Sequence, residues 1–195
     1  MRNIFLFIAL ILLNINVFAQ YDSNKTLTGF WGIKFGSSYN EVKSLMNQKQ
    51  GCVYNPESSS KSLIYSDGKF AGEKIDFLSL SFHNGKFYKA ICILNPFSES
   101  TLFTTYESIK QDLANKYFDP NNEIEEYIYP YKKGDGHELT AIKTDKAAFG
   151  SIWNFNNESI TMLIDNKLRI ALFYDNDNVK RVVEELYKKK VVNDL

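Results

Sequence analysis

The chain has 195 residues, of which 44% are hydrophobic and 15% aromatic, and its 23 basic residues balance 23 acidic ones. A balanced charge provides no general attraction for nucleic acid or for an anionic membrane, so neither is expected as a partner. The length is sufficient for one domain with a sizeable core.

The first residues, MRNIFLFIALILLNINVFAQ, have the pattern of a secretory signal peptide. Arg2 gives a positive start, residues 4–13 are apolar, and small residues precede a cleavage point after Ala19. The apolar run is shorter than the roughly 20 residues that a transmembrane helix needs. We therefore expect residues 1–19 to be removed, and residues 20–195 to form a single domain of a secreted or periplasmic protein without a transmembrane span.

Three stretches, residues 38–49, 101–117 and 177–190, have the apolar spacing of amphipathic helices. Ser38 followed by Glu41 predicts a capping box at the start of the first helix. Thr104 and Glu107 have the same spacing and predict a capping box in the second.

Residues 29–46, GFWGIKFGSSYNEVKSLM, allow two interpretations. Gly32, Gly36, Ser37 and Ser38 run into a helix, as in loops that bind phosphate at a helix N-terminus. A capping carboxylate at Glu41 would repel such an anion, which favours a purely structural start. Within this interpretation, the alternation of residues 31, 33 and 35 predicts an extended segment packed on the core.

Two stretches alternate between apolar and polar residues around a turn signal. In FLSLSFHNGKFYKAICIL, Asn84-Gly85 predicts a two-residue hairpin turn. The predicted register places Phe82 opposite Phe87, Leu80 opposite Lys89 and Leu78 opposite Ile91. The polar face then carries Ser79, Ser81, His83, Tyr88 and Cys92. A second hairpin is expected at 159–176, and extended segments at 123–133 and 137–155.

The two halves of the chain resemble each other. SSYNEVKSLM from Ser37 aligns with TTYESIKQDL from Thr104, and the following hairpins also match. The expected fold is α+β: two similar helix-plus-antiparallel-meander units, at about 30–96 and 100–176, forming one sheet with helices on one face. A C-terminal helix at 177–190 follows.

A tandem of such units behind a signal peptide resembles the beta-lactamase-inhibitor-protein-like fold, which is shared with outer-membrane assembly lipoproteins of the SmpA/OmlA type. Gly36, Glu41, Val42 and Leu45 are similar to the helix start of those modules. The opening WGIKFG is also similar to that of a wider class of uncharacterised secreted bacterial proteins. The resemblance implies a tandem topology. The chain departs from the lipoprotein members because no cysteine stands at the cleavage point, so we do not expect it to share their lipid anchor.

The sequence carries no complete catalytic or cofactor-binding motif. His83 and His137 have no partner at the spacing of a metal site. Asp175, Asp177 and Asn178 resemble part of a calcium loop but lack its glycine and distal glutamate, and Asp177 suits the start of a helix equally well. We therefore expect no metal and no cofactor.

Tyrosines are the main candidate binding residues. Tyr127, Tyr129 and Tyr131 alternate, which predicts that they share one side of a strand, and Tyr88 joins the open face of the sheet. Amphipathic rings in such a row suit an interface, and they equally suit core packing.

We expect an exported, non-enzymatic binding module that recognises a secreted protein, an envelope component or a glycan through the open face of its sheet. Two alternatives stay open. Glu123 and Glu125 share a strand face with Glu126 beside them, so a glycan- or peptidoglycan-acting hydrolase with paired carboxylates is the first. A small-ligand carrier with a cavity between helices and sheet is the second.

The two cysteines, Cys52 and Cys92, also allow two states. In an oxidising compartment they are a candidate disulfide. Spacing alone does not show that their Cα atoms approach, so two buried free thiols are the alternative.

Overall fold

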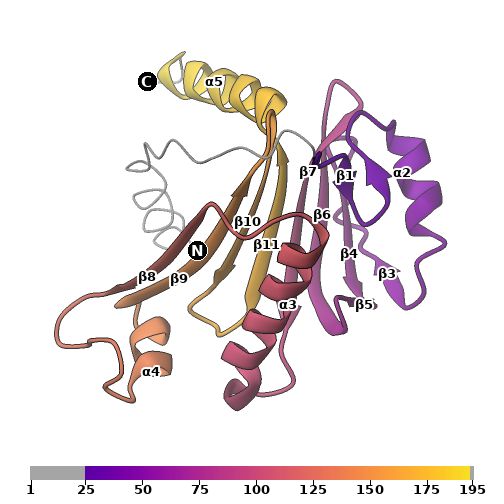
Figure 1. Ribbon diagram of the computed structural model, residues 1–195. Coiled ribbons are helices and arrows are strands. Elements are labelled where there is room, and N and C mark those ends of the chain that lie inside the picture. Colours follow the sequence, from indigo (N-terminus) through magenta and orange to yellow (C-terminus); the bar gives the residue numbers. More distant parts are fainter. Residues whose placement is uncertain (1–24, 194–195) are drawn as a thin grey trace.

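A computed structural model of the protein describes residues 25–193 (Figure 1). The predicted signal peptide lies outside the described residues. The described residues contain no helix that is long and apolar enough to span a bilayer. In chain order, the elements are β1 (Gly29–Phe30), β2 (Ile33–Lys34), α2 (Tyr39–Met46), β3 (Cys52–Tyr54), β4 (Ser62–Asp67), β5 (Lys69–Phe70), β6 (Glu73–His83), β7 (Lys86–Asn95), α3 (Leu102–Lys116), β8 (Asn122–Tyr127), α4 (Glu138–Lys143), β9 (Ala147–Asn154), β10 (Glu158–Ile164), β11 (Ile170–Asn176) and α5 (Asp177–Asn193).

A nine-stranded antiparallel sheet organises the structure. Its order is β3-β4-β6-β7-β11-β10-β9-β8, with β5 paired to β6. The first half of the chain supplies one side and the second half the other, and β7 and β11 join them. The α+β class, the antiparallel sheet and the C-terminal helix are therefore confirmed. The two-unit repeat stays a prediction, although this strand order is what two such units would give.

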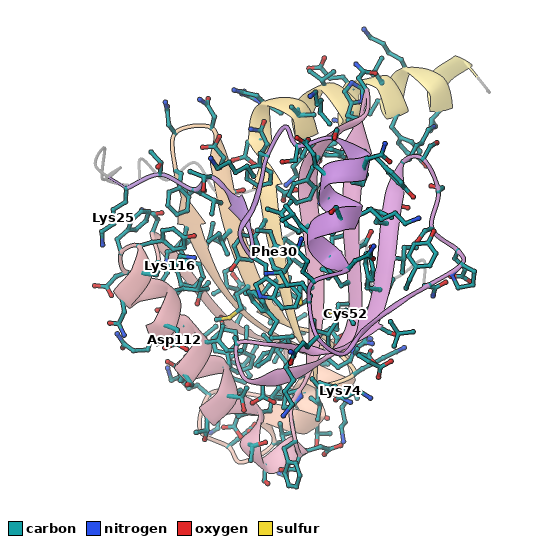
Figure 2. All side chains as sticks on the ribbon, turned by 90° about the vertical axis from the view of Figure 1, so that its right-hand side faces the viewer. Lys25, Phe30, Cys52, Lys74, Asp112 and Lys116 are labelled. Atoms are coloured by element: carbon teal, nitrogen blue, oxygen red, sulfur yellow. The ribbon has the colours of Figure 1, made fainter. Side chains whose placement is uncertain are left out.

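One face of the sheet, the core face, is covered by α2, α3 and the β1–β2 hairpin. The Tyr106 hydroxyl of α3 is 2.8 Å from the Ser151 hydroxyl on β9. Phe30 in β1 packs edge-on against Tyr174 of β11, with ring centroids 5.0 Å apart. The Phe30 side chain is fully buried, and Figure 2 labels it near the middle of the molecule. Residues that the repeat aligns, Val42 with Ile109 and Met46 with Leu113, all lie on the buried sides of their helices.

The opposite face of the sheet, which we call the open face, carries the residues that alternate with those of the core face. Its central residues are Phe77, Ile91, Ile93, Leu163 and Phe173, all partly exposed. Each alternates with core-face residues that are buried, such as Cys92 and Leu172. α5 starts at one end of the open face and projects beyond the sheet (Figure 1).

The first helix starts as predicted. The Ser38 N–H donates to the Glu41 carboxylate at 2.7 Å, and the Glu41 N–H donates to the Ser38 hydroxyl at 3.4 Å. These bonds hold the pKa of Glu41 below its ordinary value. The predicted box at Thr104 is wrong, because α3 begins at Leu102 and Thr104 lies inside it.

The predicted hairpin is present, but its register is wrong beyond the turn. Asn84 and Gly85 have φ of 49° and 72°, and Phe82 faces Phe87. A bulge between Ser81 and Phe82 shifts the pairing by one residue, so Leu78 faces Cys92. Cys92 is therefore in the core and not on the polar face.

Two extended predictions are also corrected. The segment 137–155 begins with α4, because Ala141 and Ile142 are buried together on a single helical turn. The segment 123–133 is a strand only as far as Tyr127, and a cis peptide bond follows at Tyr129–Pro130.

Candidate binding site

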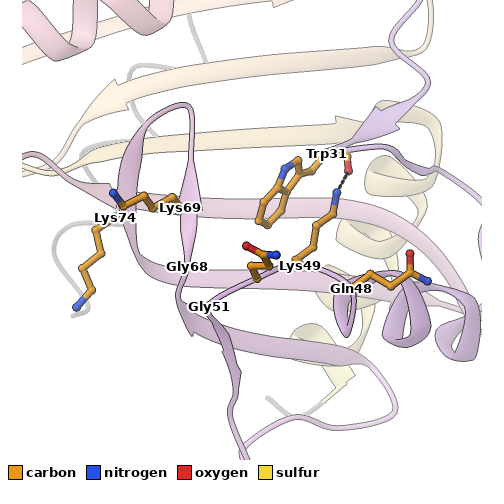
Figure 3. Close-up of a pocket in the computed structure, with 8 residues that line it drawn as sticks. Trp31, Gln48, Lys49, Gly51, Gly68, Lys69 and Lys74 are labelled. Atoms are coloured by element: carbon orange, nitrogen blue, oxygen red, sulfur yellow. Dashed lines mark hydrogen bonds between the residues drawn. The ribbon is translucent and has the colours of Figure 1, made fainter.

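A cleft of about 690 Å³ opens beside the β1–β2 hairpin. We call it the Trp31 cleft (Figure 3). Its walls come from four places in the first half of the chain: the β1–β2 turn, the segment after α2, the turn after β4, and strands β5 and β6. The lining residues are Trp31, Gln48, Lys49, Gln50, Gly51, Gly68, Lys69 and Lys74.

Trp31 has an unusual backbone for its residue type. It occupies the first position of the two-residue turn between Phe30 and Ile33, with φ of 51°, and Gly32 follows with φ of 82°. Such a turn favours asparagine, aspartate or glycine at that position. The extended segment predicted from the alternation of 31, 33 and 35 is therefore interrupted by this turn, although β2 is a short strand and all three side chains pack on the core as expected. Phe30 and Ile33 enter the core, and Trp31 remains partly exposed at the turn.

Lys49 contacts both the backbone carbonyl and the indole ring of Trp31. Its ammonium donates to the Trp31 carbonyl at 3.0 Å and lies 4.6 Å from the centroid of the indole ring. Phe70 packs edge-on against the same indole at 5.5 Å. These contacts fix the position of Trp31, and Figure 3 shows its indole between Lys49 and the pair formed by Lys69 and Lys74.

Lys69 and Lys74 face each other across the β5–β6 hairpin. The Lys74 ammonium is 3.0 Å from Asp67, a contact that holds the pKa of that carboxyl below its ordinary value. Lys69 has no carboxylate partner within residues 25–193. Lys49, Lys69 and Lys74 thus all line the cleft, and the neighbouring carboxylate of Asp67 forms an ion pair with Lys74.

Tight backbone contacts shape the floor of the cleft. Gly51 and Gly68 both have positive φ, and a Cβ on Gly68 would lie 2.6 Å from the Cys52 sulfur. Asp67 and Ala71 also have positive φ, at 59° and 50°. Such strained conformations gather where a surrounding structure enforces them, often at ligand sites.

Sequence reasoning missed this site, although a signal was present. Trp31-Gly32 and Ala71-Gly72 each place glycine where Asn84-Gly85 does, at the second position of a two-residue turn. Reading the first pair as a turn would have placed Trp31 on the surface.

The structure separates the predicted tyrosines. Tyr127 packs against Phe149, and burial with the neighbouring Glu125 raises its pKa to about 12. Tyr131 packs partly against the core, whereas Tyr129 is 90% exposed. The predicted single row is wrong, because β8 ends at Tyr127.

Tyr88, which was predicted on the open face apart from this row, lies near the end of the open face where α5 begins. It is the extra residue of the β7 bulge and lies close to Asp175 and Glu184. Burial and these carboxylates raise the pKa of Tyr88.

The candidate carboxylates lie on the same side of β8, as predicted, and each binds a lysine. Glu123 is 3.2 Å from Lys110, and Glu125 pairs with Lys133, which holds the pKa of Glu125 low. The described residues contain no group of acidic, histidine or cysteine side chains arranged to hold a metal ion. His137 precedes α4, and His83 flanks the hairpin turn.

Both cysteines are free thiols in the structure. Strands β4 and β6 separate the strand of Cys52 from the strand of Cys92. Cys92 is fully buried and Cys52 partly buried, and burial raises the pKa of both thiols. The structure therefore has two free thiols, as in the second predicted state, but only Cys92 is fully buried.

A thiol titration tests this state. We expect Ellman's reagent to react slowly with native protein, first at Cys52, and to detect both thiols only after unfolding. Mass spectrometry after alkylation would assign the order. Protein from an oxidising compartment that shows no free thiol after unfolding would contradict the expectation.

Searches for relatives found no matching protein family, no similar characterised protein and no similar solved structure.

Proposed function

We propose that the protein is an exported, non-enzymatic binding module that recognises a component of the cell envelope, and that the Trp31 cleft is its recognition site. The proposal rests on Trp31. A non-glycine residue with a left-handed backbone costs about 1–3 kcal/mol, and a large aromatic residue brings no compensating turn preference. Asparagine at position 31 would adopt the positive φ that this turn requires, so the turn itself does not require tryptophan. The indole is therefore better explained by what it contacts in the cleft.

Trp31→Asn separates folding from binding. Asn-Gly is the preferred sequence for this turn, so we expect the variant to keep its stability within about 1 kcal/mol, the turn gain offsetting lost packing on Phe70. We expect binding to isolated envelopes of the source organism to be lost. Co-sedimentation measures binding, and thermal denaturation measures stability.

Phe97→Ser is the matched control. Phe97 is 95% exposed and does not line the cleft, so this variant removes an aromatic side chain and should sediment like the wild type. If wild type and Trp31→Asn sediment equally, the proposal fails.

The open face of the sheet is a second candidate surface for binding a partner. Its five central side chains, Phe77, Ile91, Ile93, Leu163 and Phe173, are partly exposed and apolar. Binding of a protein through this face, as the sequence predicts, stays a prediction.

A further inference from the structure

We infer that the Trp31 cleft binds an anionic glycan, a saccharide chain that carries carboxylate or phosphate groups. The inference rests on the proposed function of the cleft and names the chemistry of its ligand.

The first argument is charge. Lys69 and Lys74 are directly opposite each other on neighbouring strands, an arrangement in which like charges repel. Lys49 adds a third ammonium from the segment after α2 and donates to a backbone carbonyl, which carries no formal charge. Within residues 25–193, the Asp67 carboxylate forms an ion pair only with Lys74, and it also accepts a hydrogen bond from the Ser66 hydroxyl. An anionic ligand would offset the repulsion that remains and would give Lys69 a partner.

The second argument is the rest of the lining. Gln48 and Gln50 are both exposed, and their side-chain amides both donate and accept hydrogen bonds, as sugar hydroxyls require. Trp31 adds apolar ring surface beside these polar groups. The cleft is open to solvent, so a ligand can enter as part of a longer chain.

An acidic peptide fits less well. Peptides commonly bind by adding a strand to a free sheet edge, using main-chain hydrogen bonds. β5, the strand beside the cleft, is only two residues long.

Affinity electrophoresis with defined polymers tests the inference. Alginate is the anionic glycan, dextran the neutral glycan and poly-L-glutamate the acidic peptide. We expect alginate alone to retard the wild type strongly, with retardation falling as salt rises. Lys69→Gln/Lys74→Gln should weaken alginate binding roughly tenfold. Lys132→Gln/Lys146→Gln carries the same charge change away from the cleft and should bind like the wild type.

The outcomes separate this inference from the proposed function. Stronger retardation by poly-L-glutamate, or equal retardation by dextran, would overturn the anionic glycan while envelope binding through Trp31 still stood. Equal weakening by both double variants would show attraction by net charge only and would also overturn it. Trp31-independent envelope binding would instead overturn the proposed function, whichever polymer bound.

Discussion

Replacing Trp153 with alanine is expected to lower the free energy of unfolding by about 3–5 kcal/mol, the range for removing a large aromatic side chain from a core. Trp153 is 0% exposed, and its indole N–H donates to the Phe118 carbonyl at 2.8 Å. The variant therefore creates a cavity and leaves the partly buried Phe118 carbonyl without its donor. Urea denaturation followed by circular dichroism measures the change, because that signal does not depend on the indole.

The two tryptophans make this prediction specific. Trp31 and Trp153 are the only two in the chain. Trp31→Asn should leave stability nearly unchanged and abolish binding, whereas Trp153→Ala should lower stability while any folded fraction still binds. Phe97→Ala, at an exposed position, should change stability by less than about 0.5 kcal/mol. A Trp153→Ala variant as stable as Phe97→Ala would mean that the core is not packed as described.

Elements with strong periodicity could be predicted from the sequence. Helix α3 has five apolar residues at regular steps, and four of them inside the helix are buried. The Asn84-Gly85 hairpin was found because both residue types favour positive φ. The α+β class followed from these elements.

Single-residue irregularities could not be predicted in the same way. The bulge at Tyr88 moves Cys92 to the core face, and no local preference marks it, since bulges are set by packing of the whole sheet. β8 likewise ends at Tyr127 without a local signal, so Tyr129 and Tyr131 do not share a strand face with Tyr127.

The cleft depended on tertiary structure. Lys49, Lys69 and Trp31 are far apart in the sequence and meet only because the β1–β2 hairpin packs over β5 and β6. Only the turn that carries Trp31 had a local signal. The tyrosine row had a clear pattern and was wrong, because alternation also requires the strand to continue.

Replacing Asp175 with alanine is expected to destabilise the protein by about 3 kcal/mol and to release α5 from the sheet. The Asp175 side chain is 3% exposed and lies 3.1 Å from Lys89 on β7 and 3.0 Å from Lys180 on α5. Losing it leaves two lysines without their anion. The expected value is at the low end of the range for broken buried pairs, because both lysines are partly exposed. Hydrogen exchange should show that Asp175→Ala, compared with the wild type, accelerates exchange more in α5 than in β11.

Asp177→Asn is the matched control, because the two aspartates are two residues apart and differ in their partners. Asp177 accepts a hydrogen bond from the Ser159 hydroxyl at 2.9 Å, and burial raises its pKa. An amide oxygen can still accept that bond without a buried charge, so the variant should be as stable as the wild type or more stable at pH 7.

The raised pKa of Asp177 determines how the stability difference between Asp177→Asn and the wild type changes with pH. A raised pKa in the folded state means that the contribution of Asp177 is fully present below its unfolded pKa and is lost as the pH rises through its folded pKa. The advantage of Asp177→Asn over the wild type should therefore shrink as the pH falls from 7 towards 4. Taking the difference between the two proteins cancels the shared carboxylates whose pKa is lowered, such as Asp67 and Glu125, which act in the opposite direction. An Asp177→Asn variant that loses as much stability at pH 7 as Asp175→Ala would show that the anchor of α5 requires both charges.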